Sequence, residues 1–470
     1  MIEDATALAE SIRLGHVSAT AAMQASLAAA DAHETLGAIV HLDREMGESL
    51  SRDMDRELVA APAQFRARPF GGVPTLAKDL GGPFSGLPVA AGSRLFGRTK
   101  SSADSDLAQR FRAAGLCPFG LTTSPEFGLS LASEPAAGPL CRNPLDQTRT
   151  AGGSSGGAAA AVAAGIVAIA HATDAGGSIR VPAACCGLVG LKPGRGVMPS
   201  GPTFGNHLGG IASEFVVTRS VRDAATAFAA LSGRVQGPFA DAPALAAARG
   251  PLQIGVLTQT GDRHATSPDR SAAVDAAALA LEAQAHSLTR LNWAMFDDMV
   301  SASGRAFGAI ISVNLAALVD AMGLDMAQTE RLTQAFVMRG RALSAAALWE
   351  SLNEAVLVSR DLWHIFDRVD VILAPMLASA PLPIGSFPTN HDDADRQLDR
   401  MADFAPLASL ANISGFPAIT LPFGADADGL PLPVQLIAPF GHEPLLLALA
   451  GQLEAEGRWQ HRFPVAGFSA

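Results

Sequence analysis

Apolar residues recur along the chain either near helical spacing or in short runs of strand length. The stretch 19–34 is Ala-rich with apolar residues near helical spacing, which predicts a helix capped by Ser18 or Thr20. The charged, amphipathic stretch 43–61 predicts a surface helix. The same criteria predict helices over 104–114, 155–164 and 444–456, and strands over 116–121, 166–170, 371–373, 418–421 and 434–437.

Alternation of strands and helices points to one fold class. It implies βαβ units, so we expect an α/β fold with a mixed, mostly parallel twisted sheet flanked by helices. The stretch of about 260–365 carries few turn signals and predicts a mainly helical insertion packed on the sheet. No linker or internal repeat divides the sequence. We therefore expect a single domain over 1–470, with a core motif region over 71–200.

Composition supports a large core and excludes several function classes. The 470-residue chain is 49% hydrophobic and 17% charged, which allows a sizeable buried core. Its formal net charge is −11, and no Lys/Arg-rich stretch provides a nucleic-acid-binding face. Tyrosine is absent, which excludes a phenol as acid, nucleophile or oxyanion donor.

The N-terminus, the apolar runs and the cysteines favour a cytoplasmic protein. The first residues lack the basic and apolar regions of a secretory signal. The longest apolar run, 158–170, is shorter than the ~20 residues of a membrane span. The cysteines, including the adjacent Cys185 and Cys186, match neither a disulfide framework nor a zinc site. We expect buried thiols and no membrane partner.

Three glycine-containing segments carry the candidate chemistry. They are Gly-Gly-Val-Pro-Thr-Leu-Ala-Lys-Asp over 71–79, Gly-Gly-Ser-Ser-Gly-Gly over 152–157, and Asp-Ala-Gly-Gly-Ser-Ile-Arg-Val-Pro over 174–182. Lys78 lies in an otherwise apolar run, where burial would depress its pKa and favour base chemistry. The glycine pairs permit backbone conformations and close approaches that other residues do not.

The third segment has the features of an oxyanion-binding turn. Ser178 follows a Gly-Gly pair where a helix is predicted to begin, and Pro182 fits the first turn of that helix. Backbone N–H groups at such a start favour negative charge, as an oxyanion hole requires. The candidate donors are the N–H groups of Ala175, Gly176, Gly177 and Ser178.

Other interpretations of these segments remain open. A Gly/Ser-rich stretch is commonly a loop, and an isolated Lys-Asp pair is commonly solvated. Residues 153–157 also satisfy G-x-S-x-G with Ser155 as the nucleophile of a hydrolase elbow, but the polar, proline-containing stretch 143–150 is a poor preceding strand. No phosphate loop, dinucleotide fingerprint or H-E-x-x-H metal motif occurs.

Taken together, the three segments resemble the amidase signature family. The resemblance is strongest over 71–200, where the run from Gly152 to Pro193 matches almost continuously, and it is thin over 260–365. It implies a Ser-Ser-Lys triad in which Ser178 is the nucleophile, Ser154 bridges after a cis peptide bond, and Lys78 is the base. Ala172, Ala175 and Gly194 depart from the family pattern without removing a triad member.

We add hypotheses for supporting residues to the reaction that the resemblance implies. Asp174 and Arg180 would pair to shape the loop, and Ser155 would support it by hydrogen bonds. Ser178 would attack an amide carbonyl, form an acyl-enzyme, and release a carboxylate and ammonia or an amine. This reaction needs neither a metal nor an organic cofactor, so we expect none. We expect the substrate pocket to be lined by the loop after Gly120, by residues near 204–211, and by parts of 300–350.

Three functions fit this pattern. A stand-alone amidase for small molecules is favoured by local features such as Ser133-Glu134-Pro135. The alternatives are a glutaminase subunit of a tRNA-dependent amidotransferase and a non-catalytic binding protein on the same fold. The expected partner is a small-molecule amide, without nucleic acid or membrane, and a homodimer is the assembly to test.

Overall fold

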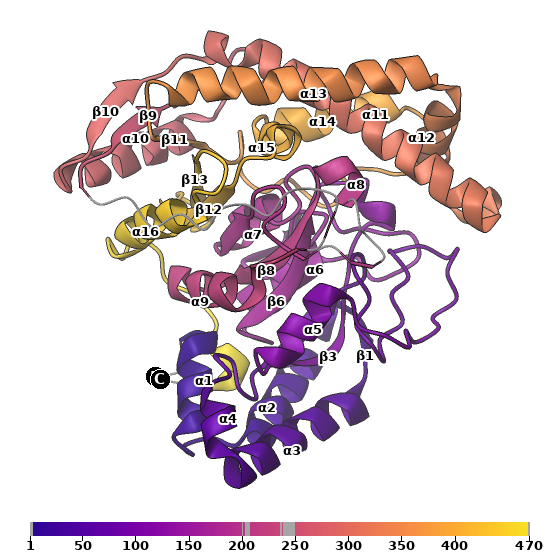
Figure 1. The fold of residues 1–470 in the computed structure, drawn as a ribbon, viewed down its shortest axis with the longest axis vertical. Coiled ribbons are helices and arrows are strands. Elements are labelled where there is room, and N and C mark those ends of the chain that lie inside the picture. Colours follow the sequence, from indigo (N-terminus) through magenta and orange to yellow (C-terminus); the bar gives the residue numbers. More distant parts are fainter. Residues whose placement is uncertain (1–2, 200, 203–206, 236, 238–249, 469–470) are drawn as a thin grey trace.

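A large sheet runs through the molecule. A computed structural model describes residues 3–199, 201–202, 207–235, 237 and 250–468. Its 11-stranded sheet has the order β1-β3-β2-β6-β8-β7-β12-β13-β11-β9-β10 (Figure 1). The strands are β1 (Ile39–Leu42), β2 (Pro74–Lys78), β3 (Cys117–Thr122), β6 (Ile169–Asp174), β7 (Val189–Lys192), β8 (Ser213–Thr218), β9 (Gln253–Val256), β10 (Ser287–Arg290), β11 (Val371–Pro375), β12 (Ala418–Ala425) and β13 (Pro431–Ile437).

The helices cover this sheet from the ends and faces. The α-helices are α1 (Ala5–Arg13), α2 (Ala19–Ala32), α3 (Arg44–Ala60), α4 (Pro62–Arg66), α5 (Asp106–Ala113), α6 (Gly156–Ala163), α7 (Arg180–Cys186), α8 (His207–Gly210), α9 (Val221–Leu231), α10 (Pro268–Ala283), α11 (Asp297–Met322), α12 (Arg331–Ala342), α13 (Ala345–Phe366), α14 (Ala394–Phe404), α15 (Ala408–Ser414) and α16 (Glu443–Glu454). In Figure 1, α1–α4 lie at the lower end of the molecule and α10–α14 at the upper end.

The α/β class and the mixed sheet are confirmed, but the expectation of a mostly parallel sheet is wrong. β3, β2 and β6 pair in parallel, as do β11, β9 and β10. The six other pairings that the described residues form within this sheet are antiparallel. β8 returns between β6 and β7, and β12 and β13 form a hairpin around the Asp428-Gly429 turn, a signal that favours antiparallel pairing.

Most elements expected between 19 and 164 form within one or two residues of their predicted bounds. Ser18 caps α2, since its hydroxyl accepts the Ala21 N–H at 3.0 Å. β6 begins later than expected and extends to Asp174. The reason is the end of α6, where Gly165 has φ +77° and the N–H groups of Ile166 and Val167 still bond to Ala161 O.

The stretch 260–365 is mostly helical, as expected, but it also holds β10. β10 pairs in parallel with β9 at the sheet edge. Also within 260–365, helix α11 is long and apolar enough to cross a membrane by length and composition alone. Because 61% of its apolar window is buried inside the protein, and because it packs on α12, α13 and α15, we interpret α11 as a core helix.

The chemistry-bearing segments converge at one end of neighbouring strands. Lys78 ends β2 and Asp174 ends β6, and these two strands pair in parallel. Every residue of α6, which follows Ser154 and Ser155, is buried, so this small-residue helix packs on all sides. The four cysteines are free and buried, as expected. The fold thus places Lys78 and the two serine segments around one buried point.

Candidate active site

Lys78 lies at the centre of the site. Its side chain is 1% exposed, and its Nζ lies 2.7 Å from Ser154 Oγ and 2.7 Å from Thr173 Oγ1. Burial lowers the pKa of Lys78 from 10.5 to about 7, although the charges of Asp174 and Glu214 act to raise it. The expectation that the apolar run around Lys78 buries the amine is therefore confirmed.

Ser154 is held between two glycine-containing turns. The Gly153–Ser154 peptide bond is cis, as the resemblance implied. Ser133 Oγ donates to Ser154 O at 3.1 Å and accepts the Gly156 N–H at 2.9 Å, which fixes the backbone around the serine. A Cβ at Gly128 would lie 3.2 Å from Ser154 Oγ, so a larger residue there would crowd the hydroxyl.

Ser178 lines the same cavity as Ser154. It is 7% exposed, and its carbonyl accepts the Ser155 N–H at 3.3 Å, which ties the two serine segments together. In the part of the chain that the structure describes, the hydrogen-bonded path runs from Lys78 to Ser154, and no bond joins the Ser154 and Ser178 hydroxyls. The helix after Ser178 begins at Arg180, so Pro182 lies in its first turn, as expected.

The structure changes the set of candidate oxyanion donors. The Gly177 N–H donates to Asp174 Oδ1 at 2.7 Å, so the prediction of Gly177 as a donor is wrong for this structure. The N–H groups of Ala175, Gly176 and Ser178 have no acceptor among the described residues, and all three residues line the cavity. Gly176 also packs under Phe307, whose ring a Cβ would approach to 2.8 Å.

Asp174 and Arg180 form the buried pair that was expected. Both are 0% exposed, and Arg180 Nε and Nη2 lie 3.0 and 3.1 Å from the Asp174 oxygens. Arg180 also donates to Gln435, Ala408 O and Asn412. Burial acts to raise the pKa of Asp174, but the charge and hydrogen bonds of Arg180 outweigh it and hold that pKa well below its usual range. The pair therefore fixes the turn that carries Ser178.

Ser155 does not take the position of an elbow nucleophile. Its Oγ donates to Thr173 O at 3.1 Å, and it is fully buried away from the described cavity lining. The polar stretch before it does form strands, β4 (Arg142–Asn143) and β5 (Asp146–Thr150), which corrects the expectation of a poor strand. These two strands form a separate sheet, so they provide no central strand for an elbow.

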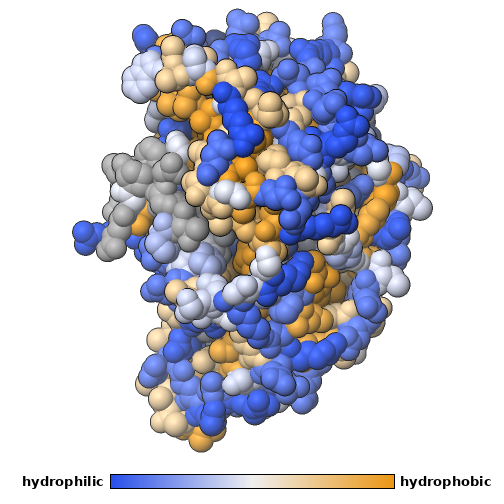
Figure 2. Space-filling model, turned by 90° about the vertical axis from the view of Figure 1, so that its right-hand side faces the viewer, coloured by the Kyte–Doolittle hydropathy of each residue, from blue (hydrophilic) through white to orange (hydrophobic). Residues whose placement is uncertain are grey.

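A cavity of about 360 Å³ opens over these groups and is mostly apolar. Its described lining includes residues from the three regions that were expected, after Gly120, at 207–212 and within 300–350, and further residues from 80–96, from the serine segments and from positions 214 and 401. Residues 204–206, which were also expected here, lie outside the described residues. The lining includes Leu80, Val89, Phe96, Phe127, Leu129, Phe307, Ile311, Asn314, Leu315, Leu318, Met322, Phe336 and Met401. Figure 2 shows apolar residues exposed among hydrophilic ones on the face beside α12.

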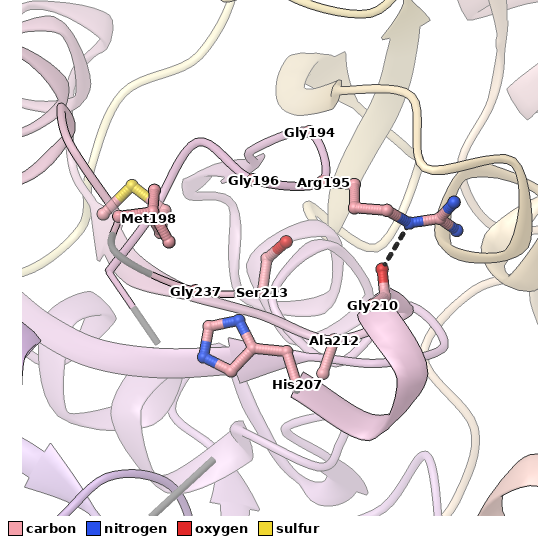
Figure 3. A pocket seen from close by; sticks show the side chains of 10 residues that line it. Gly194, Arg195, Gly196, Met198, His207, Gly210, Ala212, Ser213 and Gly237 are labelled. Atoms are coloured by element: carbon pink, nitrogen blue, oxygen red, sulfur yellow. Dashed lines mark hydrogen bonds between the residues drawn. The ribbon is translucent and has the colours of Figure 1, made fainter. Parts of the chain in front are cut away.

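A second, water-sized pocket of about 10 Å³ adjoins this cavity and shares His207 and Ala212 with it (Figure 3). Arg195 Nε donates to Gly210 O at 2.9 Å, which joins the 194–196 loop to α8. His207 is 8% exposed, and burial lowers its pKa although Glu214 acts to raise it. Within the described residues, no group of three or more His, Cys, Asp or Glu side chains could hold a metal ion.

Three site residues were missed at the sequence level. Thr173 contacts Lys78 Nζ, His171 Nδ1 accepts the Lys78 N–H at 3.1 Å, and Glu214 Oε2 lies 3.1 Å from His171 Nε2. Thr173 directly precedes Asp174, and its place next to a recognised motif was a usable signal. Glu214 lies on β8 opposite Thr173, and only the strand register brings it to the site.

Comparison with known proteins supports an amide-hydrolysing family. The family model described as Amidase matches residues 21–447. The 6-aminohexanoate-cyclic-dimer hydrolase of Paenarthrobacter ureafaciens is 33% identical over 502 residues, covering 98% of this chain and 96% of that protein. The structure of a 6-aminohexanoate cyclic dimer hydrolase complexed with substrate has a TM-score of 0.89 and 31% identity over 99% of both chains. A bacterial aryl acylamidase, at 23% identity and a TM-score of 0.82 over 100% of this chain and 99% of that one, supports the fold alone.

Proposed function

The chain belongs to the amidase signature family, whose enzymes hydrolyse amide C–N bonds, and we propose that it is a stand-alone hydrolase of small-molecule amides. The observation that carries the proposal is the buried Lys78 Nζ, which lies 2.7 Å from the Oγ of Ser154, a residue that lines the cavity together with Ser178. A neutral amine beside a hydroxyl is the arrangement that a serine nucleophile without histidine requires.

In the proposed reaction, Lys78 accepts a proton from Ser154 while Ser154 accepts one from Ser178. Ser178 Oγ bonds to the amide carbon, and the carbonyl oxygen becomes an oxyanion near the N–H groups of Ala175, Gly176 and Ser178. Ser154 then gives a proton to the leaving nitrogen as the C–N bond breaks and recovers one from Lys78, which becomes neutral again. Water hydrolyses the resulting ester, which releases the carboxylate and regenerates Ser178.

The electrostatics of Lys78 support its role as the base. The difference between a pKa of 10.5 and one of about 7 corresponds to about 5 kcal/mol in favour of the neutral amine. An unperturbed lysine would be neutral roughly once in 2,500 molecules at pH 7, whereas Lys78 would be neutral in roughly half of them. Burial thus supplies the reactive form without an imidazole.

The cavity favours this function over a glutaminase subunit. Glutamine carries an α-carboxylate, which amidases of that class must bind with a cation or several donors. The described lining of the cavity contains no Arg or Lys, and aromatic and aliphatic side chains dominate it. A relative named 6-aminohexanoate-cyclic-dimer hydrolase, similar over nearly the whole chain, also supports a small-molecule amide. The intact Lys78–Ser154 contact argues against a binding protein without catalysis.

We infer a cytoplasmic location, a homodimer as the assembly to test, and no nucleic-acid or membrane partner. The net charge of −11 supports the absence of a nucleic-acid partner, because phosphate binding needs a basic face. The burial of most of the α11 window supports the absence of a membrane partner. Size-exclusion chromatography with light scattering would test the assembly.

An amide panel and a covalent probe test the proposal together. The purified chain is expected to hydrolyse neutral aliphatic or aryl amides without a partner subunit. A fluorophosphonate probe is expected to add one label, on the peptide that contains Ser178, as measured by mass spectrometry. A folded chain that turns over none of the amides and takes no label would contradict the proposal, and a label on Ser155 would favour the elbow mechanism.

The pH dependence of turnover gives a separate prediction. Since the folded-state pKa of Lys78 is about 7 and the neutral form is the active one, kcat/KM for a neutral amide should rise about tenfold per pH unit below 7. It should level off above about pH 8. Rates measured from pH 5 to 9 in buffers of constant ionic strength would show this limb. A rate that is flat across pH 6–8 would exclude Lys78 as the titrating base.

A further inference from the structure

A row of polar side chains crosses three adjacent strands beside the reacting groups. Lys78 ends β2, Thr173 lies on β6, and Glu214 lies on β8 directly opposite Thr173 in the antiparallel register. Lys78 Nζ contacts Thr173 Oγ1 at 2.7 Å. Gly81 packs against this row, since a Cβ there would lie 3.0 Å from Thr173 and 3.3 Å from Glu214 Oε1. The lack of a side chain at Gly81 therefore lets the Glu214 carboxylate line the cavity.

Hydrogen bonds hold the Glu214 carboxylate in place and in its charged form. Oε1 accepts the Gly82 N–H at 2.9 Å, and Oε2 lies 3.1 Å from His171 Nε2. Because His171 Nδ1 accepts the Lys78 N–H, the ring proton is on Nε2 and is donated to Glu214. Burial acts to raise the pKa of Glu214, but the hydrogen bond from His171 and the neighbouring groups outweigh it and lower that pKa.

The acidic and basic side chains that line the cavity carry one negative charge in total. Among the described lining residues, Glu214 and His207 alone carry ionisable side chains, and burial keeps His207 neutral by lowering its pKa. Asp174 and Arg180 cancel one another behind the lining. Asp79 is also buried behind it, where it accepts the N–H groups of Ala90 and Gly92. The remaining walls are mostly apolar, so they screen the Glu214 charge weakly.

We propose that Glu214 makes this cavity selective for amides that carry an ammonium group over amides of equal length that carry a carboxylate. The proposal rests on the function proposed above and specifies its substrate class. An ammonium group in the cavity compensates the buried carboxylate, whereas a second carboxylate is repelled. A carboxylate on the substrate would also stabilise the protonated form of Lys78, which cannot act as a base. The negative charge of such a substrate would therefore disfavour both its binding and its turnover.

Binding of three probes of equal length tests the proposal without requiring turnover. Hexylammonium, 1-hexanol and hexanoate would be titrated into the full chain at pH 8.5 by calorimetry. Hexylammonium is expected to bind about tenfold or more tightly than hexanoate, with 1-hexanol between them. In Glu214→Gln this ratio should fall to about twofold or less. Glu443→Gln is the matched control, because Glu443 is also buried and accepts a backbone N–H, from Gly194, but does not line the cavity.

Two results would overturn the proposal. Equal binding of hexylammonium and hexanoate by the unchanged chain would do so without any variant. An unchanged ratio in a folded Glu214→Gln protein would do so as well. If that variant does not fold, Glu214→Asp keeps the charge and must keep the ratio. Hydrolysis of neutral hexanamide is measured in parallel, so that a chain without amidase activity is distinguished from an active chain without charge selectivity.

Discussion

Replacing Ser178 with alanine should reduce kcat/KM for a neutral amide by a factor of about 10⁴ or more, because no other group can form the acyl-enzyme. Lys78→Ala should cause a loss of similar size, since both serines would lose their base. Effects within one catalytic unit are strongly non-additive, so the double variant should be little worse than either single one. Steady-state rates with an amide that releases a chromophoric amine would measure all three variants.

Ser155→Ala is the matched control for Ser178→Ala. Ser155 lies next to Ser154, is fully buried, and bonds to the Thr173 backbone rather than facing the cavity. Its loss should lower activity by about tenfold through a looser backbone, a typical effect of one lost buried hydrogen bond. A fully active Ser178→Ala protein together with an inactive Ser155→Ala protein would reverse the assignment and favour the elbow mechanism.

The parts of the site that could be predicted from sequence are those set by local backbone requirements. Lys78, Ser154 and Ser178 lie in short segments whose glycines fix the turn, so each segment carries its own signal. Glu214 carries none, because it reaches the site only through the register between β6 and β8. The alternation of strands and helices led to an expectation of parallel pairing. That expectation was wrong in part because β8 returns between β6 and β7 and pairs with both in antiparallel register.

Competition between hydrogen-bond acceptors explains why the prediction of Gly177 as an oxyanion donor was wrong. Gly177 has the spacing of an oxyanion donor, but the Asp174 carboxylate takes its N–H. A sequence pattern places an N–H group in a turn without showing which acceptor it meets. The same carboxylate binds Arg180 and receives the N–H of Ile179. Asp174 therefore holds the turn through the backbone N–H groups that it accepts. The N–H groups that it does not accept, those of Ala175, Gly176 and Ser178, remain available to the cavity.

This role of Asp174 leads to the second large expected effect. Arg180→Met should lower the free energy of unfolding by about 3–5 kcal/mol, because it leaves the fully buried Asp174 without its cation. Urea unfolding at pH 7 would measure the loss. Arg263→Met is the control, since Arg263 and Asp399 form an exposed ion pair with 67% and 62% of their side chains accessible. Its cost should stay below about 1 kcal/mol.

The pH dependence of this loss separates the charge of Asp174 from the packing of Arg180. In the unchanged chain the folded-state pKa of Asp174 is depressed, so its stabilising contribution is present above the ordinary value of 3.8 and is lost as pH falls below it. In Arg180→Met, burial without a cation raises that pKa instead, so the penalty grows as pH rises and disappears once Asp174 is protonated. The difference in unfolding free energy between the two proteins should therefore shrink on acidification from pH 7 towards pH 4. A difference that is constant over this range would mean that Arg180 stabilises the turn by packing alone.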